Sequence, residues 1–280
     1  MSKFIRYALV LSILLGTSVL IAYRIFAPSQ DAGVTDDWRN SDKQSNIVVD
    51  HSLWQTTLDD YLVSDTENRV AQFDYQGYLD DQTQLLDEYI DYLSSINPTE
   101  LNREEQFAFW VNLYNALTVQ IVLENYPVDS IKNLGEATFP PGPWNDEAVM
   151  VSGKALTLNH IEHSILRPIW QDYRIHFAVN CASIGCPNLQ SEAFTASNTE
   201  KLLNIAAEEF INHPRGLNLT NDELTLSSIF NWYSEDFGES QTQVVNLLSK
   251  HSPRSLQEKL ANFDGKITYQ YDWALNELQE

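Results

Sequence analysis

The residues best suited to chemistry lie in one short segment, residues 174–187, which holds both cysteines of the chain. Apolar residues alternate there with His176 and Asn180, a period-2 pattern typical of a strand with one apolar face. By this alternation, His176 lies on the face opposite Cys181. Small residues and chain breakers follow as far as Pro187, so the strand must end at Cys181. A thiol at the end of a rigid strand is fixed and reachable, which suits a nucleophile or a redox pair.

A catalytic cysteine needs a base that generates the thiolate and usually a third group that orients the base. His160, His163 and Arg167 follow at helical spacing on a predicted short helix, where they form an electropositive face. Such a face would lower the pKa of a nearby thiol. We therefore expect Cys181 to be the nucleophile, His163 its base and Glu162 an orienting group. The alternative is structural: His163 and Arg167 would bond to loop carbonyls or to Glu162.

The two cysteines could instead be bonded to each other. An exported protein meets an oxidising environment, and the four residues between Cys181 and Cys186 include a glycine that helps to close the ring. So small a loop stabilises a fold by only roughly 2 kcal/mol, so the bond would fix the turn more than the fold. It would also preclude a free nucleophile at Cys181. The spacing is not the C-x-x-C of thiol oxidoreductases.

Metal and cofactor sites are not expected. His160 and His163 could ligate a metal together with a cysteine or His176, but H-x-x-H alone is a weak signal and differs from the H-E-x-x-H of zinc proteases. No Asp-x-Asp-x-Asp-Gly calcium loop is present either. The prediction is therefore no metal and no cofactor.

One predicted helix, up to Leu123, is apolar on almost every face and should be central and buried. Asn102 and Glu105 have the spacing of a capping box at its start. Asn112 and Asn115 form a polar stripe on it with Thr118, which lies three residues further on. Buried amides need partners, so the stripe either tethers a neighbouring loop or lines a polar pocket. In a pocket, Asn112 would orient a catalytic group or stabilise an oxyanion, and Asn115 would help bind the ligand.

The other elements follow from periodicity, caps and turn residues. Further helices are predicted at 50–64, 78–95, 158–168, 199–212, 240–250 and 253–262, hairpins at 148–157 and 217–226, and strands near 69–75 and 266–271. Asn159 is the expected cap and Pro168 the expected stop of the 158–168 helix, Pro253 is expected at a first helical position after Ser252, and Asp272 is expected to cap a terminal turn. Together they predict an α+β fold, a single domain with helices packed on a small, mainly antiparallel sheet.

The N-terminus has the features of a membrane-targeting segment. Lys3 and Arg6 precede an apolar run over residues 7–23, and no clean cleavage site follows Arg24. We expect residues 1–26 to be an uncleaved signal anchor, the alternative being a cleaved signal peptide. Residues 27–48 are expected to be a flexible tether, and residues 49–280 the globular domain. Both alternatives place the domain in the periplasm, anchored to the inner membrane or secreted.

The chain is strongly acidic, with a formal net charge of −22. The first thirty residues hold three basic residues and no acidic one, so residues 31–280 carry −25. Such a domain repels nucleic-acid phosphates and anionic lipid surfaces, which excludes both as partners of the domain itself. The membrane is then contacted only through the N-terminal helix.

Four motifs in order resemble the domain of unknown function 547 family: residues 109–118 (FWVNLYNALT), 161–167 (IEHSILR), 176–187 (HFAVNCASIGCP) and 271–276 (YDWALN). The resemblance covers about residues 50–276. It implies one domain, often exported in bacteria, and no known activity. The positions that match the family's characteristic polar residues are Asn112, Asn115, Glu162, His163, Arg167, His176 and Cys181. In the family the second cysteine is sometimes serine, which weakens the case for an essential disulfide.

Two functions remain open on the sequence alone. The first is a thiol-centred pocket, of a hydrolase or an acyl or peptidyl transferase, that takes a small molecule or a peptide, with Arg167, His176 and Asn115 in binding roles. The second is a non-catalytic envelope binding or assembly module, in which Cys181 and Cys186 form a structural disulfide. The sequence does not name a protein partner.

Overall fold

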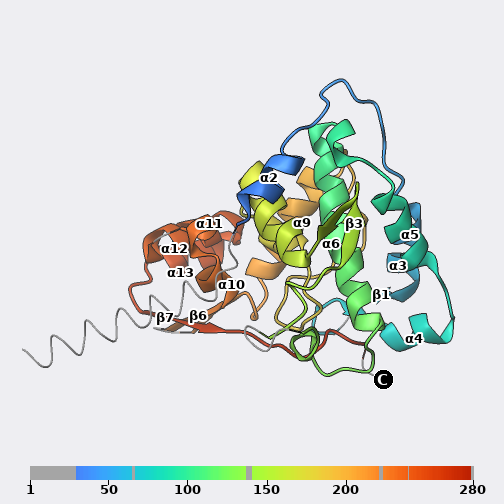
Figure 1. Ribbon diagram of the computed structural model, residues 1–280. Helices are drawn as coiled ribbons and strands as arrows, with labels where there is room; N and C mark the ends of the chain where they lie inside the picture. Colours follow the sequence, from blue (N-terminus) through green and yellow to red (C-terminus); the bar gives the residue numbers. More distant parts are fainter. Residues whose placement is uncertain (1–29, 65–66, 137–140, 221–222, 239, 279–280) are drawn as a thin grey trace, which may run out of the picture.

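The fold is built around one long buried helix, α6 (Arg103–Leu123), which runs through the middle of the molecule (Figure 1). The computed structural model describes residues 30–64, 67–136, 141–220, 223–238 and 240–278. Asn102 caps α6 as predicted, because its side chain accepts a hydrogen bond from the backbone N–H of Glu105. Residues 105–119 of α6 are all buried, so no face of this helix is left to solvent. The prediction of a central, buried helix is confirmed.

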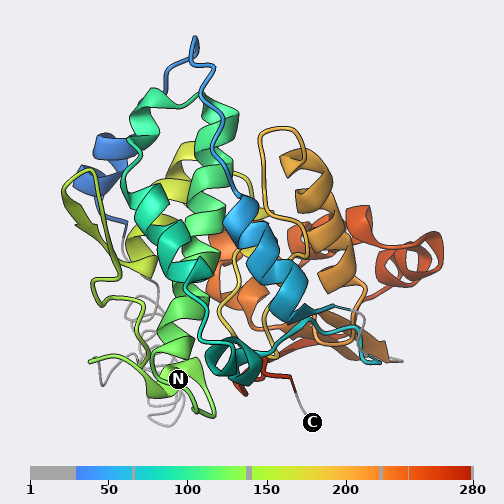
Figure 2. The same cartoon turned by 90° about the vertical axis from the view of Figure 1, so that its right-hand side faces the viewer.

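Helices α3 (Ser52–Tyr61) and α5 (Leu85–Ser94) lie along one side of α6, and α9 (Thr199–Ile211) lies on the other (Figures 1 and 2). The helix predicted at 78–95 is divided into α4 (Tyr75–Asp80) and α5. The C-terminal part holds α10 (Ile229–Trp232), α11 (Ser234–Phe237), α12 (Gln241–His251) and α13 (Arg254–Ala261). Pro253 is the N-cap of α13 and not its first helical residue. The short 3₁₀ helices are η1 (Pro98–Glu100) and η2 (Ile131–Asn133).

The segment predicted as a helix and then a strand folds differently. A π-helix, η3 (His160–Leu166), continues into α7 (Arg167–Trp170), so Pro168 does not end the helix but sits in the first turn of α7, where proline is tolerated. Asn159 makes no side-chain cap bond. The predicted strand at 174–180 is wrong: Ile175–Ala178 form one helical turn, α8, followed by extended backbone at Val179.

The described strands form three small sheets. β1 (Leu62–Val63) pairs with β2 (Gln72–Phe73), and β3 (Val149–Val151) pairs with β4 (Lys154–Leu156), both antiparallel. β5 (Leu217–Thr220) pairs antiparallel with β6 (Glu223–Ser227), which pairs in parallel with β7 (Lys266–Gln270). The α+β class is confirmed, but separate small sheets, one of them mixed, replace the single mainly antiparallel sheet. Residues 221–222, at the turn of the hairpin predicted at 217–226, lie outside the described residues.

Part of the predicted tether is folded onto the domain. Ala32–Trp38 form α2, in which Thr35 and Trp38 are buried. The Thr35 hydroxyl donates to the carbonyl of Ser164 in η3 (2.6 Å), and the Trp38 ring meets the Trp110 ring edge-on at 5.3 Å. The tether prediction is therefore wrong for these residues. The predicted membrane segment lies outside the described residues, and within those residues no helix is long and apolar enough to cross a membrane.

Candidate thiol and carboxylate site

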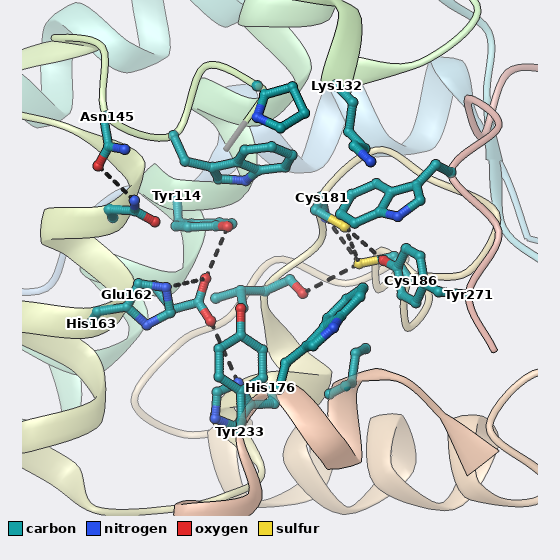
Figure 3. Close-up of a pocket in the computed structure, with 18 residues that line it drawn as sticks. Tyr114, Lys132, Asn145, Glu162, His163, His176, Cys181, Cys186, Tyr233 and Tyr271 are labelled. Carbon is teal, nitrogen blue, oxygen red and sulfur yellow. Dashed lines mark hydrogen bonds and ion pairs between the residues drawn. The ribbon is translucent and has the colours of Figure 1, made fainter. Parts of the chain in front are cut away.

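Both cysteines line a cavity of about 350 Å³ that segments distant in sequence enclose. Its walls come from α6, η3, α8 and the loop after it, α10, and the C-terminal stretch after β7. In the view of Figure 3, the two sulfurs and Tyr271 lie on one side of the cavity, and Glu162, His163 and His176 lie on the other. The volume is at the lower end of the range for small-molecule pockets.

The two thiols are in contact and are not bonded to each other. Cys181 Sγ lies 3.0 Å from Cys186 Sγ, 2.9 Å from the hydroxyl of Tyr271 and 3.3 Å from that of Ser183. The backbone N–H of Cys181 donates to Cys186 Sγ at 3.0 Å. Cys186 is buried, whereas Cys181 is partly exposed. The disulfide considered as an alternative is thus not formed in this structure, although the two sulfurs lie close together.

This environment makes the two thiols unequal. Hydrogen bonding from Cys186 lowers the pKa of Cys181, with further help from Ser183 and Tyr271, and these bonds outweigh the effect of burial. Burial raises the pKa of Cys186, and its contact with Cys181 adds to the rise. Cys181 is therefore the thiol that ionises first, while Cys186 stays protonated and stabilises the thiolate.

The C-terminal stretch holds the cysteine loop in place. Backbone N–H groups of Ile184 and Gly185 donate to the carbonyls of Ala274 and Asp272, each at 2.8 Å. A Cβ on Gly185 would lie 2.7 Å from the backbone N and O of Asp272, so only glycine allows this approach. The contact brings Tyr271 to Cys181. Asp272 caps the following turn as predicted, because its carboxylate accepts from the N–H of Ala274.

Glu162 and His163 come from η3, and π-helical turns are rare and often found at functional sites. Glu162 accepts a hydrogen bond from the hydroxyl of Tyr114 (3.0 Å) and lies 3.4 Å from Nδ1 of His176. Nε2 of His176 lies 2.7 Å from Asp236 Oδ2, so this imidazole sits between two carboxylates. Within the part of the chain that the structure describes, no atom is positioned to form a hydrogen bond with His176 Nδ1.

Arg167 connects His163 with the acidic side chains on the side away from the cavity. Its guanidinium donates to Asp236 and Glu235, each at 2.6 Å, and to Nδ1 of His163 at 3.0 Å. A guanidinium can only donate, so Nδ1 of His163 must accept. The neutral imidazole of His163 therefore carries its proton on Nε2.

Charge in this cluster is fixed by burial and by neighbours. Burial lowers the pKa of His163 to about 4, and the charge of Arg167 adds to the effect, although Glu162 opposes it. Burial opposes ionisation of Glu162, but the imidazoles of His163 and His176 and the guanidinium of Arg167 outweigh it and lower its pKa to about 2. At neutral pH Glu162 is a carboxylate and His163 is neutral.

The predicted pairing of His163 with Cys181 is not formed. Both side chains line the cavity, but the hydrogen-bond partners of the Cys181 sulfur are Cys186, Ser183 and Tyr271. His163 presents Nε2–H rather than a lone pair, so it suits donating to a substrate and not removing the proton of a thiol. The structural alternative is met only in part: His163 Nε2 lies 3.9 Å from Glu162, but Arg167 bonds to Asp236, Glu235 and His163 and not to loop carbonyls.

The asparagine stripe on α6 tethers loops, as in the first alternative. Asn112 exchanges two hydrogen bonds with the backbone of Phe194, at 2.7 and 3.0 Å. Asn115 donates to the carbonyl of Ala178 (2.9 Å) and accepts from the N–H of Asn180 (2.8 Å). Neither lines the cavity, so neither predicted role there, catalytic for Asn112 or binding for Asn115, is supported. Asn115 instead fixes the backbone directly before Cys181.

No group of three or more His, Cys, Asp or Glu side chains in the described parts of the chain is arranged to hold a metal ion. Nδ1 of His160 accepts from the N–H of Thr157, and the His160 side chain does not line the cavity. The combination of His160 with His163 as metal ligands is therefore not formed.

Several lining residues were not identified from the sequence. They are Tyr114, Lys132, Trp144, Trp232, Tyr233 and Tyr271, with Asp236 behind them. Tyr271 opens a motif noticed at the chain's end, and Tyr114 stands between the two asparagines of the stripe, so both had a signal nearby. Asp236 had none, because its partners lie 60 and 69 residues away.

Comparison with known proteins gives one match. Residues 98–211 match the family model described as "Protein of unknown function, DUF547", a shorter stretch than the resemblance over residues 50–276. No curated protein and no solved structure matches the chain. The matched stretch includes α6, η3, both cysteines and α9. This stretch, which carries Glu162, His163 and the thiol pair, is the part of the chain that is similar to the DUF547 family.

Proposed function

We propose that the cavity is the catalytic site of a thiol enzyme, a hydrolase or an acyl or peptidyl transferase, with Cys181 as its nucleophile. The observation that carries the proposal is the position of Cys181, a partly exposed residue that lines the cavity and whose Sγ contacts three groups that stabilise its ionised form. The thiolate is the reactive form of cysteine, so an acidified and reachable thiol is what such chemistry requires.

The reaction follows from the groups around the cavity. The Cys181 thiolate adds to an acyl carbon, the leaving alcohol or amine departs with a proton from solvent, and a thioester remains. Water or a second nucleophile then cleaves the thioester and restores the thiol. The Nε2–H of His163, fixed by Arg167, lies on the opposite side of the cavity from the two sulfurs and is a donor suited to a polar group of the substrate remote from the acyl carbon. His163 is thus a binding group in this proposal and not the base.

The test is acylation of the intact protein by p-nitrophenyl acetate, followed by mass spectrometry of its peptides. The expected result is one equivalent of p-nitrophenolate released and one acetyl group on Cys181, with loss of both in Cys181→Ser. The matched control is Cys186→Ser, which should still be acetylated at Cys181, but more slowly. An acetyl group found elsewhere, or none on a reduced and folded protein, would exclude Cys181 as the nucleophile.

The second candidate is a non-catalytic envelope binding or assembly module. The 3.0 Å approach of the two sulfurs and the loop-holding role of Asn112 and Asn115 favour it, since a bond between Cys181 and Cys186 would complete a rigid loop. Alkylation of the natively exported, unreduced protein separates the two functions. Protection of both thiols until reductant is added supports the module, and immediate modification of Cys181 supports the enzyme.

We further propose that residues 1–26 anchor the domain in the inner membrane with the domain in the periplasm. The support is the apolar run flanked by Lys3, Arg6 and Arg24. Fractionation of cells should find the full-length chain in the membrane pellet, with the domain digested by protease only after the outer membrane is opened. A shortened chain in the soluble periplasmic fraction would show that the segment is a cleaved signal.

A further inference from the structure

The wall of the cavity is rich in tyrosine and tryptophan rings, and its buried end holds the carboxylate of Glu162. Rings of Trp144, Trp232, Tyr271 and Tyr233 line it, and Trp273 lies between two of them, 5.7 Å from Trp144 and 5.6 Å from Trp232. Aromatic faces attract cations, and carboxylates do so more strongly.

We propose that this cavity binds a ligand with an ammonium group, primary or quaternary, whose positive charge lies against the Glu162 carboxylate and the aromatic wall. The proposal names the ligand class of the site under "Proposed function" and rests on that cavity being the working site. It does not require Cys181 to react.

The carboxylate of Glu162 has room for another donor. Among the described residues, the hydroxyl of Tyr114 donates a hydrogen bond to it, while His176 Nδ1 and His163 Nε2 lie at 3.4 and 3.9 Å. Two carboxylate oxygens offer about four acceptor positions, so several remain open. Glu162 is nearly fully buried and lines the cavity, and an ionised group in such a place is costly without a partner.

The cluster behind Glu162 does not cancel its charge. Among the described residues of this cluster, Arg167 supplies the guanidinium, and it is shared between Asp236 and Glu235 at 2.6 Å each. The carboxylates of Glu162, Asp236 and Glu235 therefore outnumber the guanidinium, so the cluster keeps a net negative charge. The acidic domain adds a long-range attraction for cations.

A cation of the chain itself marks the other end of the cavity. Lys132 Nζ lies 4.9 Å from the centre of the Trp273 ring, so the same aromatic wall already holds an ammonium group at that point. Lys132 would repel a second cation from its own end. A ligand's ammonium group is thus directed to the end with Glu162 (Figure 3).

The test compares cations with neutral molecules of the same shape, using calorimetry on the full-length protein in detergent. The pairs are choline with 3,3-dimethylbutanol and benzylammonium with benzyl alcohol. At least one cation should bind about tenfold more tightly than its neutral partner. Glu162→Gln should abolish this preference, whereas Glu192→Gln, which removes the same charge from an exposed site, should keep it.

A second variant guards against misfolding of Glu162→Gln. The ring of Tyr233 is only partly buried and stacks on His176 at the end with Glu162, so Tyr233→Leu should fold and should weaken the preference for the cation without abolishing it. Equal binding of cations and neutral partners, or no binding of any cation, overturns the proposal. If the cation preference is present and acetylation of Cys181 is absent, the thiol function alone fails; the reverse result leaves the thiol function and refutes the ligand class.

Discussion

Cys181 is acidified by hydroxyl and thiol donors and not by an imidazole. The hydroxyl of Tyr271 contacts both Cys181 Sγ and Ser183 Oγ at 2.9 Å, so it holds two of the groups around the sulfur in place. This arrangement differs from the thiolate–imidazolium pair that the sequence suggested. The reactivity of Cys181 should therefore depend on Tyr271.

Tyr271→Phe should slow the alkylation of Cys181 by iodoacetamide at neutral pH severalfold, because removal of the hydroxyl takes one donor from the thiolate. The pH at which the alkylation rate reaches half its maximum should rise. Tyr269→Phe, at an exposed ring on β7, is the control and should leave the rate unchanged. An unchanged profile in Tyr271→Phe would show that the hydroxyl does not stabilise the thiolate.

Asn115 should act through the backbone and not on a ligand. Asn115→Ala leaves the carbonyl of Ala178 and the N–H of Asn180 without partners in a buried place, so we expect a loss of about 2–4 kcal/mol in the free energy of unfolding by urea. Asn125→Ala, at an exposed position after α6, should cost far less. A fully stable Asn115→Ala protein would contradict the tether.

Helix α2 belongs to the folded domain, and Trp38 is its main contact. Its ring is 2% exposed and meets Trp110 of α6. Trp38→Ala should lower the free energy of unfolding by about 3–5 kcal/mol, as expected for a large buried ring. Val48→Ala, at a side chain 77% exposed, is the control and should have little effect. Equal stability of the two variants would mean that α2 does not pack as described.

The elements predicted correctly are those whose pattern reflects one dominant force. α6 was identified because apolar residues on every face require burial, and α9 because its apolar stripe has helical spacing. The strand at 174–180 failed because residues 175–180 are all buried, including His176 and Asn180. An alternating pattern indicates a strand only if one face is exposed to solvent, and here both sets of alternating residues are buried.

The site was predicted in part, because only the residues that lie close together in the sequence could be recognised. Local sequence identified Cys181, Glu162, His163 and His176, all of which line the cavity. It could not supply the partner of Cys181, since Tyr271 is 90 residues away and reaches it only through the contact of Gly185 with Asp272. Spacing along a chain does not determine which distant segments meet.

Across the whole molecule, the cavity lies where two hydrophobic clusters meet. The larger cluster surrounds α6 and includes Tyr114 and Val179, and the smaller one surrounds β6 and α12 and includes Ile229. Side chains of both line the cavity. Pockets often form at such junctions, because two cores packed separately leave space between them. The charged cluster around Arg167 lies at this junction, since Glu162 and His163 line the cavity. Protonation of the side chains in this cluster should therefore change the free energy of unfolding of the entire fold.

The free energy of unfolding should therefore fall over two separate pH ranges as acid is added. The pKa of His163 is about 4 in the folded chain against 6.5 unfolded, so the unfolded state binds more protons and stability falls as pH drops from about 6.5 to 4. That shift corresponds to a loss on the order of 3 kcal/mol. His51, whose pKa is also about 4, adds to the same stage. Glu162 and Asp236, with pKa values of about 2, add a second loss between about pH 4 and 2.

Urea unfolding at a series of pH values measures both stages. His163→Gln should flatten the dependence between pH 6.5 and 4 by the share that belongs to His163, and His51→Gln by the share of His51, which leaves the contributions of His213 and His251, whose pKa values burial also lowers. Neither substitution changes the carboxylates, so the decline below pH 4 should persist in both variants. If His163→Gln retained the full slope between pH 6.5 and 4, the neutral imidazole held by Arg167 could not be part of the folded cluster.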